Sequence, residues 1–200
     1  MLVEKRDGTK QEVSFDKILN RIRLLCFGDE FIKKINIDPV LIAQKVCTEI
    51  HDGVKTSKLD ELASETAVSL YSKNPDYSIL ASRIVISNHI KSTISRFSEV
   101  IYNLHSKNII QDYLYELVKE NEELIDSQIK EENDYNIDFF GFKTLQKSYL
   151  LKIDDNIVER PQHLFMRVSL CIHRDNLEKA FETYNHISNK DFIHATPTLF

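Results

Sequence analysis

Glycine is scarce in this chain, with four residues in 200. Average usage is about 7%, so the chain has well under half the expected number. Glycine-rich phosphate loops are excluded, because neither G-x-x-x-x-G-K-[ST] nor G-x-G-x-x-G occurs. No apolar run approaches the roughly 20 residues of a membrane span, and the first ten residues lack the apolar core of a signal peptide. We therefore expect no membrane partner.

Cysteine is also sparse. Cys26, Cys47 and Cys171 lie far apart and form no C-x-x-C pair, which argues against a zinc ribbon or a thioredoxin-type site. Cys26 and Cys47 have apolar neighbours, which is typical of buried structural thiols in a reducing cytoplasm. The seven histidines are scattered and form no H-E-x-x-H motif, so we expect no metal ligands among them.

Excess positive charge is absent as well, since the formal net charge is -5 and the pI is near 5.8. Nucleic acid is therefore not an expected partner, although a local basic patch can still hold one anion. With 42% hydrophobic and 28% charged residues, the composition suits a soluble globular protein with a real core. The length allows one domain or two small ones.

The chain opens with a hairpin pattern. Two short segments, near 2–6 and 10–14, flank Asp7-Gly8, a strong turn signal because both residues tolerate positive φ. Ser14 then precedes apolar residues at helical spacing and can cap that helix, which Gly28 ends. The pattern predicts two strands followed by a helix.

Further helices follow in the first half. Asp38-Pro39 is typical of a helix start, and Gly53 is expected to stop that helix. A short extended stretch, 54–56, leads into a third helix at Ser57-Lys58-Leu59-Asp60, which resembles a capping box. A long fourth helix is predicted from Leu80 to about 105, after a break at Asn74-Pro75-Asp76. The first hundred residues thus predict a small three-stranded sheet on about four helices.

Residues 112–138 hold ten acidic and two basic side chains. A solvated helical surface or linker is the favoured interpretation, because Leu117, Ile125 and Ile129 recur at helical spacing and indicate packing. An acidic tail for a basic partner is the alternative.

The remainder predicts more helices. One follows Phe139, another opens at Arg160-Pro161-Gln162 after a turn at Asp154-Asp155-Asn156, and a last one covers about 175–188. The apolar stretch 194–200 is expected to be a strand. The fold class is therefore mainly α, with a small β component (α+β).

Basic residues gather near the predicted hairpin. Lys5 and Arg6 precede the turn, and Lys17 lies in the first turn of the next helix, where unpaired N–H groups and the helix dipole favour an anion. Together these residues can hold a polyanion without a glycine loop. An ordinary solvated hairpin fits the same spacing.

Three further residues have ordinary interpretations from the pattern alone. Thr56 is a residue type common in turns. Asp60 would lie in the first turn of a helix, where the helix dipole favours an acid. Lys91 lies beside an apolar stripe, from which its ammonium group can reach water.

Several segments carry a family resemblance. Residues 3–8 and 13–18, with Asn74-Pro75-Asp76-Tyr77 to Ile84, resemble an ATP-cone domain. Phe140-Gly141-Phe142-Lys143-Thr144-Leu145, Glu159-Arg160-Pro161-Gln162-His163 and Ala195-Thr196-Pro197-Thr198-Leu199-Phe200 resemble the large subunit of class I ribonucleoside-diphosphate reductase, eukaryotic or viral type. The similarity covers the whole chain in one register. It implies an ATP-cone at 1–95, a helical acidic connector at 96–138, and at 139–200 the start of the large subunit's helical domain, which leads into a truncated barrel.

The resemblance also implies roles for particular residues. Ile18 would pack against adenine, Thr56 and Asp60 would lie beside the base and sugar, and Lys91 would contact phosphate. Asp60 is similar to the acid through which the family distinguishes ATP from dATP. The full set implied for the effector is Lys5, Arg6, Gln11, Glu12, Val13, Ser14, Phe15, Asp16, Lys17, Ile18, Thr56, Asp60 and Lys91. Thr196 matches a substrate-binding position.

The resemblance implies that the chain is part of an oxidoreductase that makes deoxyribonucleotides. Its own cysteines match none of the reaction's redox cysteines, so we expect no catalytic residue here. The regulatory amino-terminal portion is expected, whether as a truncated gene product, one piece of a split gene or a fragment. The implied ligand is ATP or dATP with magnesium, with no covalent cofactor. The implied partners are the radical-generating small subunit, the remainder of the large subunit and further copies of the chain, in the cytoplasm.

Two rival functions stay open at this point. One is a non-enzymatic nucleotide sensor, such as an ATP-cone repressor, although that class carries paired C-x-x-C motifs ahead of the cone. The other is an inactive structural remnant.

Overall fold

The structure, a computed structural model, describes residues 1–27 and 33–199. It divides into two units, one formed by 1–91 with 137–140 and the other by 92–136 with 141–200. The expected three-part division stays a prediction. Each unit is mainly helical with a small sheet, which confirms the predicted fold class. Within the described ranges no helix combines the length and the apolarity needed to cross a bilayer.

The sheet of the first unit joins segments far apart in the sequence. β1 (Leu2–Glu4) lies in the middle, antiparallel to β2 (Lys10–Glu12) and parallel to β3 (Val54–Lys55). Val3 is opposite Gln11 on one side and Val54 on the other. The predicted hairpin and the three-stranded sheet are confirmed, with shorter strands than expected.

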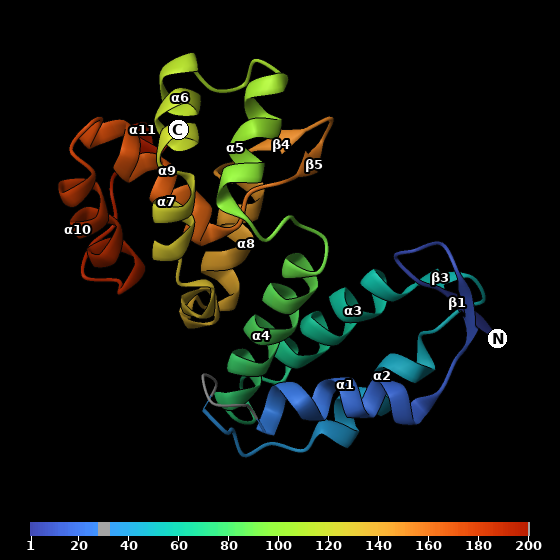
Figure 1. The fold of residues 1–200 in the computed structure, drawn as a ribbon. Coiled ribbons are helices and arrows are strands. Elements are labelled where there is room, and N and C mark those ends of the chain that lie inside the picture. The colour runs from blue at the N-terminus through green and yellow to red at the C-terminus, as the bar shows by residue number, and fades with distance from the viewer. Residues whose placement is uncertain (28–32, 200) are drawn as a thin grey trace. The chain divides into compact units, whose positions relative to one another are not determined.

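Four helices accompany this sheet in Figure 1: α1 (Phe15–Phe27), α2 (Pro39–Thr48), α3 (Thr56–Ser69) and α4 (Asp76–Ile90). α3 packs against α2 and α4, and α1 packs against α2 and α4. Asp38 is the N-cap of α2, where its side chain accepts a hydrogen bond from the Val40 N–H at 2.9 Å. Such a cap contributes about 0.5–2 kcal/mol. Gly28, which is predicted to end this helix α1, lies outside the described residues.

Two local expectations for this unit are wrong. α3 begins at Thr56 rather than after Ser57, and its N-cap, Lys55, makes no side-chain cap hydrogen bond, so the capping box does not form. The acid of that motif, Asp60, pairs instead with arginines from elsewhere in the unit. α2 ends at Thr48, and Gly53, with φ at +78°, shapes the turn before β3.

The prediction of one long fourth helix is also wrong, because α4 ends at Ile90 and α5 (Phe97–Ser106) is a separate helix. Polar groups of the intervening segment are held by partners in the second unit. Arg160 donates to the Thr93 carbonyl at 3.2 Å, and the His163 ring lies 3.2 Å from the Ser95 carbonyl. These tertiary bonds replace the i to i−4 bonds of a helix.

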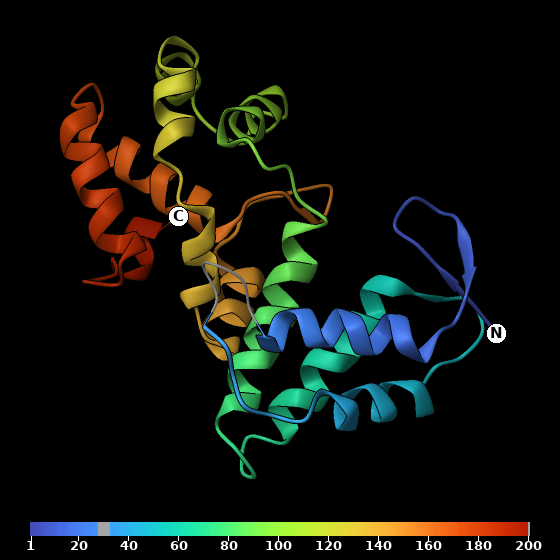
Figure 2. The same cartoon turned by 60° about the horizontal axis from the view of Figure 1, so that its bottom comes forward.

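The second unit contains α5, α6 (Asp112–Glu120), α7 (Glu122–Gln128), the 3-10 helix η1 (Glu131–Asn136), α9 (Pro161–His173) and α10 (Leu177–Ser188). It also contains most of α8 (Phe139–Ser148), whose first two residues belong to the first unit. α9 and α10, orange to red in Figure 2, pack closely. Leu117 and Ile125 are buried, as the spacing of the acidic stretch predicted. Asp126 accepts from the Ser98 N–H at 2.9 Å and so caps the start of α5.

A hairpin and a short helix complete this unit. β4 (Lys152–Ile153) and β5 (Asn156–Ile157) pair across the predicted turn, where Asp154 and Asp155 both have positive φ. The expected strand at 194–200 is wrong, because α11 (Thr196–Leu199) is a helical turn. Pro197 is tolerated in the first turn of a helix, and Leu199, which is buried, packs on α9.

Candidate functional site

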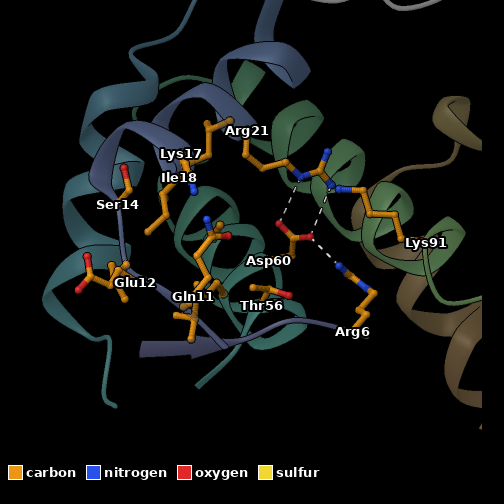
Figure 3. A pocket seen from close by; sticks show the side chains of 15 residues that line it. Arg6, Gln11, Glu12, Ser14, Lys17, Ile18, Arg21, Thr56, Asp60 and Lys91 are labelled. Atoms are coloured by element: carbon orange, nitrogen blue, oxygen red, sulfur yellow. Dashed lines mark hydrogen bonds and ion pairs between the residues drawn. The ribbon is translucent and has the colours of Figure 1, made fainter. Parts of the chain in front are cut away.

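A pocket of about 230 Å³ lies in the first unit, between the β1–β2 hairpin, the start of α1, the start of α3 and the end of α4 (Figure 3). Four basic and two acidic side chains line it, so its charge is opposite in sign to that of the whole chain. The lining consists of Val3, Arg6, Gln11, Glu12, Val13, Ser14, Lys17, Ile18, Arg21, Ile22, Thr56, Leu59, Asp60, Ala63 and Lys91.

The turn of the hairpin positions Arg6. Gly8 has φ at +80°, and Asp7 accepts hydrogen bonds from the Thr9 N–H at 2.9 Å and the Thr9 hydroxyl at 2.6 Å. These bonds lower the pKa of Asp7. The Lys5 N–H donates to the Thr9 carbonyl at 2.8 Å and closes the turn. The chain therefore leaves β1 with Arg6 beside the pocket.

The parallel pairing of β1 with β3 positions the other wall. The Leu2 N–H donates to the Asp52 side chain at 2.7 Å, and the Gly53 N–H donates to the Leu2 carbonyl at 2.8 Å. α3 starts directly after β3, so Thr56 and, one turn later, Asp60 face the pocket.

Asp60 lies between two guanidinium groups, as Figure 3 shows. Its carboxylate is 3.6 Å from Arg6 Nη2 and 3.5 Å from both Nε and Nη2 of Arg21. Arg21 Nη2 also donates to the Ser87 hydroxyl at 2.8 Å, and Arg6 donates to the Asn88 side chain. The pocket is thus joined to α4 through both arginines.

Lys91 is the C-cap of α4 and adds a fourth basic group. Partial burial and the nearby charges of Arg21 and Arg6 lower its pKa, while Asp60 acts in the opposite direction. A cluster of cations that depresses a lysine pKa in a pocket favours an anionic ligand, because an anion relieves the repulsion.

Ten of the thirteen residues implied for the effector line this pocket, although they come from four separate segments. Lys5, Phe15 and Asp16 belong to the same hairpin and helix start but are not part of the lining. Their roles stay predictions.

The sequence interpretation missed Arg21 and the apolar lining of Val3, Ile22, Leu59 and Ala63. Helical spacing contains the signal for Arg21, since it lies four residues after Lys17 and three after Ile18 and so shares their helix face.

A second hollow of about 440 Å³ lies at the other side of the start of α3. Its lining includes Lys55 and Lys58, but Lys58 is paired with Glu61 at 2.6 Å. This hollow lacks the converging side chains of the first. In the ranges that the structure describes, no group of three metal-ligating side chains is present.

Thr196, the remaining implied residue, lies in the second unit at the exposed start of α11. Its hydroxyl is 2.8 Å from the Tyr149 hydroxyl, which orients it. Its role toward a substrate stays a prediction.

Comparisons with known proteins agree with the motifs. The ATP cone domain family matches residues 1–92, and the family described as ribonucleotide reductase, all-alpha domain, matches residues 135–200. The chain is similar over its full length to the ribonucleoside-diphosphate reductase large chain of Schizosaccharomyces pombe, at 46% identity, and to the large subunits of Arabidopsis thaliana, at 44%, and Monkeypox virus, at 48%. It covers 25%, 25% and 27% of those proteins, so it spans about a quarter of the length of these curated relatives.

Proposed function

Because the chain belongs to the ribonucleoside-diphosphate reductase large-subunit family, we propose that it is the regulatory amino-terminal region of such an enzyme and that its pocket binds ATP or dATP. The observation that carries this proposal is the convergence of ten implied effector residues on one basic pocket. The match of residues 135–200 to the reductase all-alpha domain favours this function over a nucleotide sensor of another kind.

The geometry supports a division of the pocket by chemistry. Ile18, Ile22 and Leu59 supply an apolar wall for the adenine base. Thr56 and Asp60 supply polar groups for the base edge and the sugar. Arg6, Lys17 and Lys91 supply positive charge for the phosphates, and the α1 N-terminus adds N–H donors beside Lys17.

The pocket volume of about 230 Å³ is below the roughly 300–1,000 Å³ of drug-sized ligand sites. A nucleoside triphosphate would therefore bury its base and sugar and leave part of its phosphate chain at the rim. Magnesium would be held there by phosphate oxygens and water, with at most one or two carboxylates from the chain.

Effector binding would act as an activity switch. ATP and dATP bias the assembly of large subunits, and each can shift that equilibrium only by the difference in its affinity for the two states. The full enzyme would reduce ribonucleoside diphosphates in the cytoplasm together with a radical-generating small subunit and further copies of the large subunit. Thr196, oriented by Tyr149, would lie near the substrate diphosphate.

Calorimetric titration of the full chain with ATP and with dATP, each with magnesium, tests the proposal. We expect both nucleotides to bind, and Arg6→Ala to weaken both by about tenfold or more, as for loss of a charged hydrogen bond. Lys10→Ala is the matched control, because it removes the same charge from the same hairpin outside the pocket lining. Absence of binding at millimolar nucleotide, or equal effects of the two substitutions, contradicts the proposal.

The same titration is repeated with variants of Lys5 and Lys91. Lys91→Ala is expected to weaken binding because Lys91 lines the pocket, whereas the effect of Lys5→Ala decides the role of a residue outside the lining. Unchanged binding in the Lys5→Ala, Arg6→Ala double variant would refute the effector site.

A further inference from the structure

The two arginines that contact Asp60 hold it in different ways. We propose that Arg21 is a positioning residue, which fixes the Asp60 carboxylate for recognition of the nucleotide sugar, and that Arg6 is an exchangeable partner that leaves Asp60 when a triphosphate binds. This inference rests on the proposed nucleotide site and adds a specificity role to a residue that the family motifs did not include.

The Arg21 guanidinium contacts two side chains, Asp60 on α3 and Ser87 on α4. Its Nε lies 3.5 Å from Asp60 Oδ1 and its Nη2 lies 3.5 Å from Asp60 Oδ2, so the guanidinium fork faces both oxygens. Nη2 also donates to the Ser87 hydroxyl on α4 at 2.8 Å, and only 24% of the Arg21 side chain is exposed. The two bonds of Nη2, to Asp60 and to Ser87, hold the guanidinium in place, and this limits rotation of the carboxylate it faces.

Arg6 approaches Asp60 with one nitrogen rather than two. Its contact is a single ion pair of 3.6 Å from Nη2 to Oδ2, and the same Nη2 also donates to the Asn88 side chain on α4. It comes from the hairpin turn rather than from a helix, and its side chain is 31% exposed. A triphosphate carries more negative charge than one carboxylate, so an arginine at the rim exchanges partners when the phosphates arrive.

Asp60 keeps the capacity to accept more hydrogen bonds. A carboxylate has about four acceptor positions, and among the described residues only the bond from Arg21 Nη2, at 3.5 Å, reaches this one. Its side chain is 13% exposed and faces the pocket. When Arg6 leaves, Oδ2 gains room for a sugar hydroxyl while Arg21 preserves the orientation. Sugar recognition and phosphate binding are then coupled.

Arg21 has two simpler possible roles, and each makes a different prediction. A purely structural link from α1 to α4 through Ser87 would, when cut, lower stability and weaken ATP and dATP equally. A direct phosphate contact would also weaken both equally. The positioning role alone changes the ratio of the two dissociation constants, because ATP and dATP differ only at the sugar.

The experiment measures dissociation constants for ATP and dATP, together with thermal unfolding, on the full chain. We expect Arg21→Ala to move the ATP-to-dATP ratio toward one by about threefold to tenfold, the worth of one sugar hydrogen bond. Arg23→Ala is the matched control, because Arg23 lies on the same helix, is exposed and is outside the pocket lining. It should leave the ratio and both affinities unchanged.

Further variants keep the test decisive if Arg21→Ala does not fold. Arg21→Lys retains the charge but not the fork, so its ratio should fall between those of wild type and Arg21→Ala. Ser87→Ala removes the anchor of Arg21 and should shift the ratio in the same direction by less. In an Asp60→Asn background, Arg21→Ala should change the ratio no further.

The possible failures are distinguishable. If the wild-type chain binds neither nucleotide, the proposed function itself is wrong. If it binds both but its ratio is near one, or if the Arg21 variants weaken both nucleotides equally with the ratio preserved, the effector site stands and the positioning role of Arg21 is overturned.

Discussion

Asp134 and Gln162 meet in the core of the second unit, where the Asp134 carboxyl accepts a hydrogen bond of 3.2 Å from the Gln162 N–H. Asp134 is fully buried. Burial raises its pKa to about 7, while the bonds from Gln162 and the charge of Arg160 act in the opposite direction. Because the folded pKa lies above the ordinary value of 3.8, the folded chain holds a proton that the unfolded chain releases.

The stability of the second unit is therefore expected to be greater at pH 5 than at pH 8. The contribution of Asp134 is fully present below about pH 4 and is lost as the pH rises toward 7, by a total on the order of a few kcal/mol. Urea unfolding of the wild-type chain and of Asp134→Asn at both pH values measures it. Asn keeps an acceptor for Gln162 without titrating, so the variant should gain stability relative to wild type at pH 8. Parallel pH profiles would contradict this assignment.

Arg83 is expected to stabilise the first unit through main-chain contacts. Its buried guanidinium donates to the Leu25 carbonyl in the last turn of α1 at 2.9 Å and to the Lys33 carbonyl at 2.5 Å. Arg83→Met leaves these acceptors without their donors, so we expect the free energy of unfolding to fall by about 1–3 kcal/mol. Thermal and urea unfolding measure the change, with Arg23→Met on the exposed face of α1 as control. Equal effects of the two substitutions would refute the role.

The three thiols are expected to differ in reactivity. Burial raises the pKa of all three thiols, to about 11 for Cys26, which is fully buried, whereas Cys47 is half-buried and Cys171 is exposed to solvent. The thiolate is the reactive form, so Cys171 and Cys47 should react with a maleimide in the native chain at pH 8, and Cys26 only after unfolding. Mass spectrometry of peptides after timed labelling measures this order. Early labelling of Cys26 would contradict its placement.

A glycine in the turn between β4 and β5 is expected to raise the free energy of unfolding. Asp155 has φ at +64° and Asp154 at +48°, the left-handed region in which glycine has no steric cost. Asp155→Gly should therefore raise the free energy of unfolding by about 0.5–1 kcal/mol, while Asp155→Ala should lower it. Urea unfolding of the pair checks the prediction, and a destabilising glycine would show that the Asp155 side chain contributes more than the strain costs.

Local signals in the sequence predicted much of the first unit. Asp7-Gly8 indicated the hairpin, and Asp38 with Pro39 indicated the start of α2, because turns and caps depend on a few adjacent residues. The site followed from the family motifs rather than from spacing. Thr56, Asp60 and Lys91 have ordinary interpretations individually, and only the fold brings them to one pocket.

The errors share a physical cause, which is tertiary contact overriding local preference. Asp60 does not cap α3, and its carboxylate pairs instead with Arg6 from the hairpin turn and Arg21 from α1. α4 does not continue past Ile90 because Arg160 and His163 bind the polar groups that follow it. Leu199 is buried in a short helix, α11, that packs on α9. None of these partners is close in sequence, so no local pattern reveals them.

β1 contributes three residues, yet it lies between both of its neighbours in the sheet. Neither β2 nor β3 contacts the other, so deletion of these residues leaves two isolated strands and separates the turn that carries Arg6 from the helix that carries Asp60. Fusion proteins and crystallisation trials with this chain should therefore keep Leu2–Glu4 intact, since a trimmed version would lose the strand that joins two walls of the pocket.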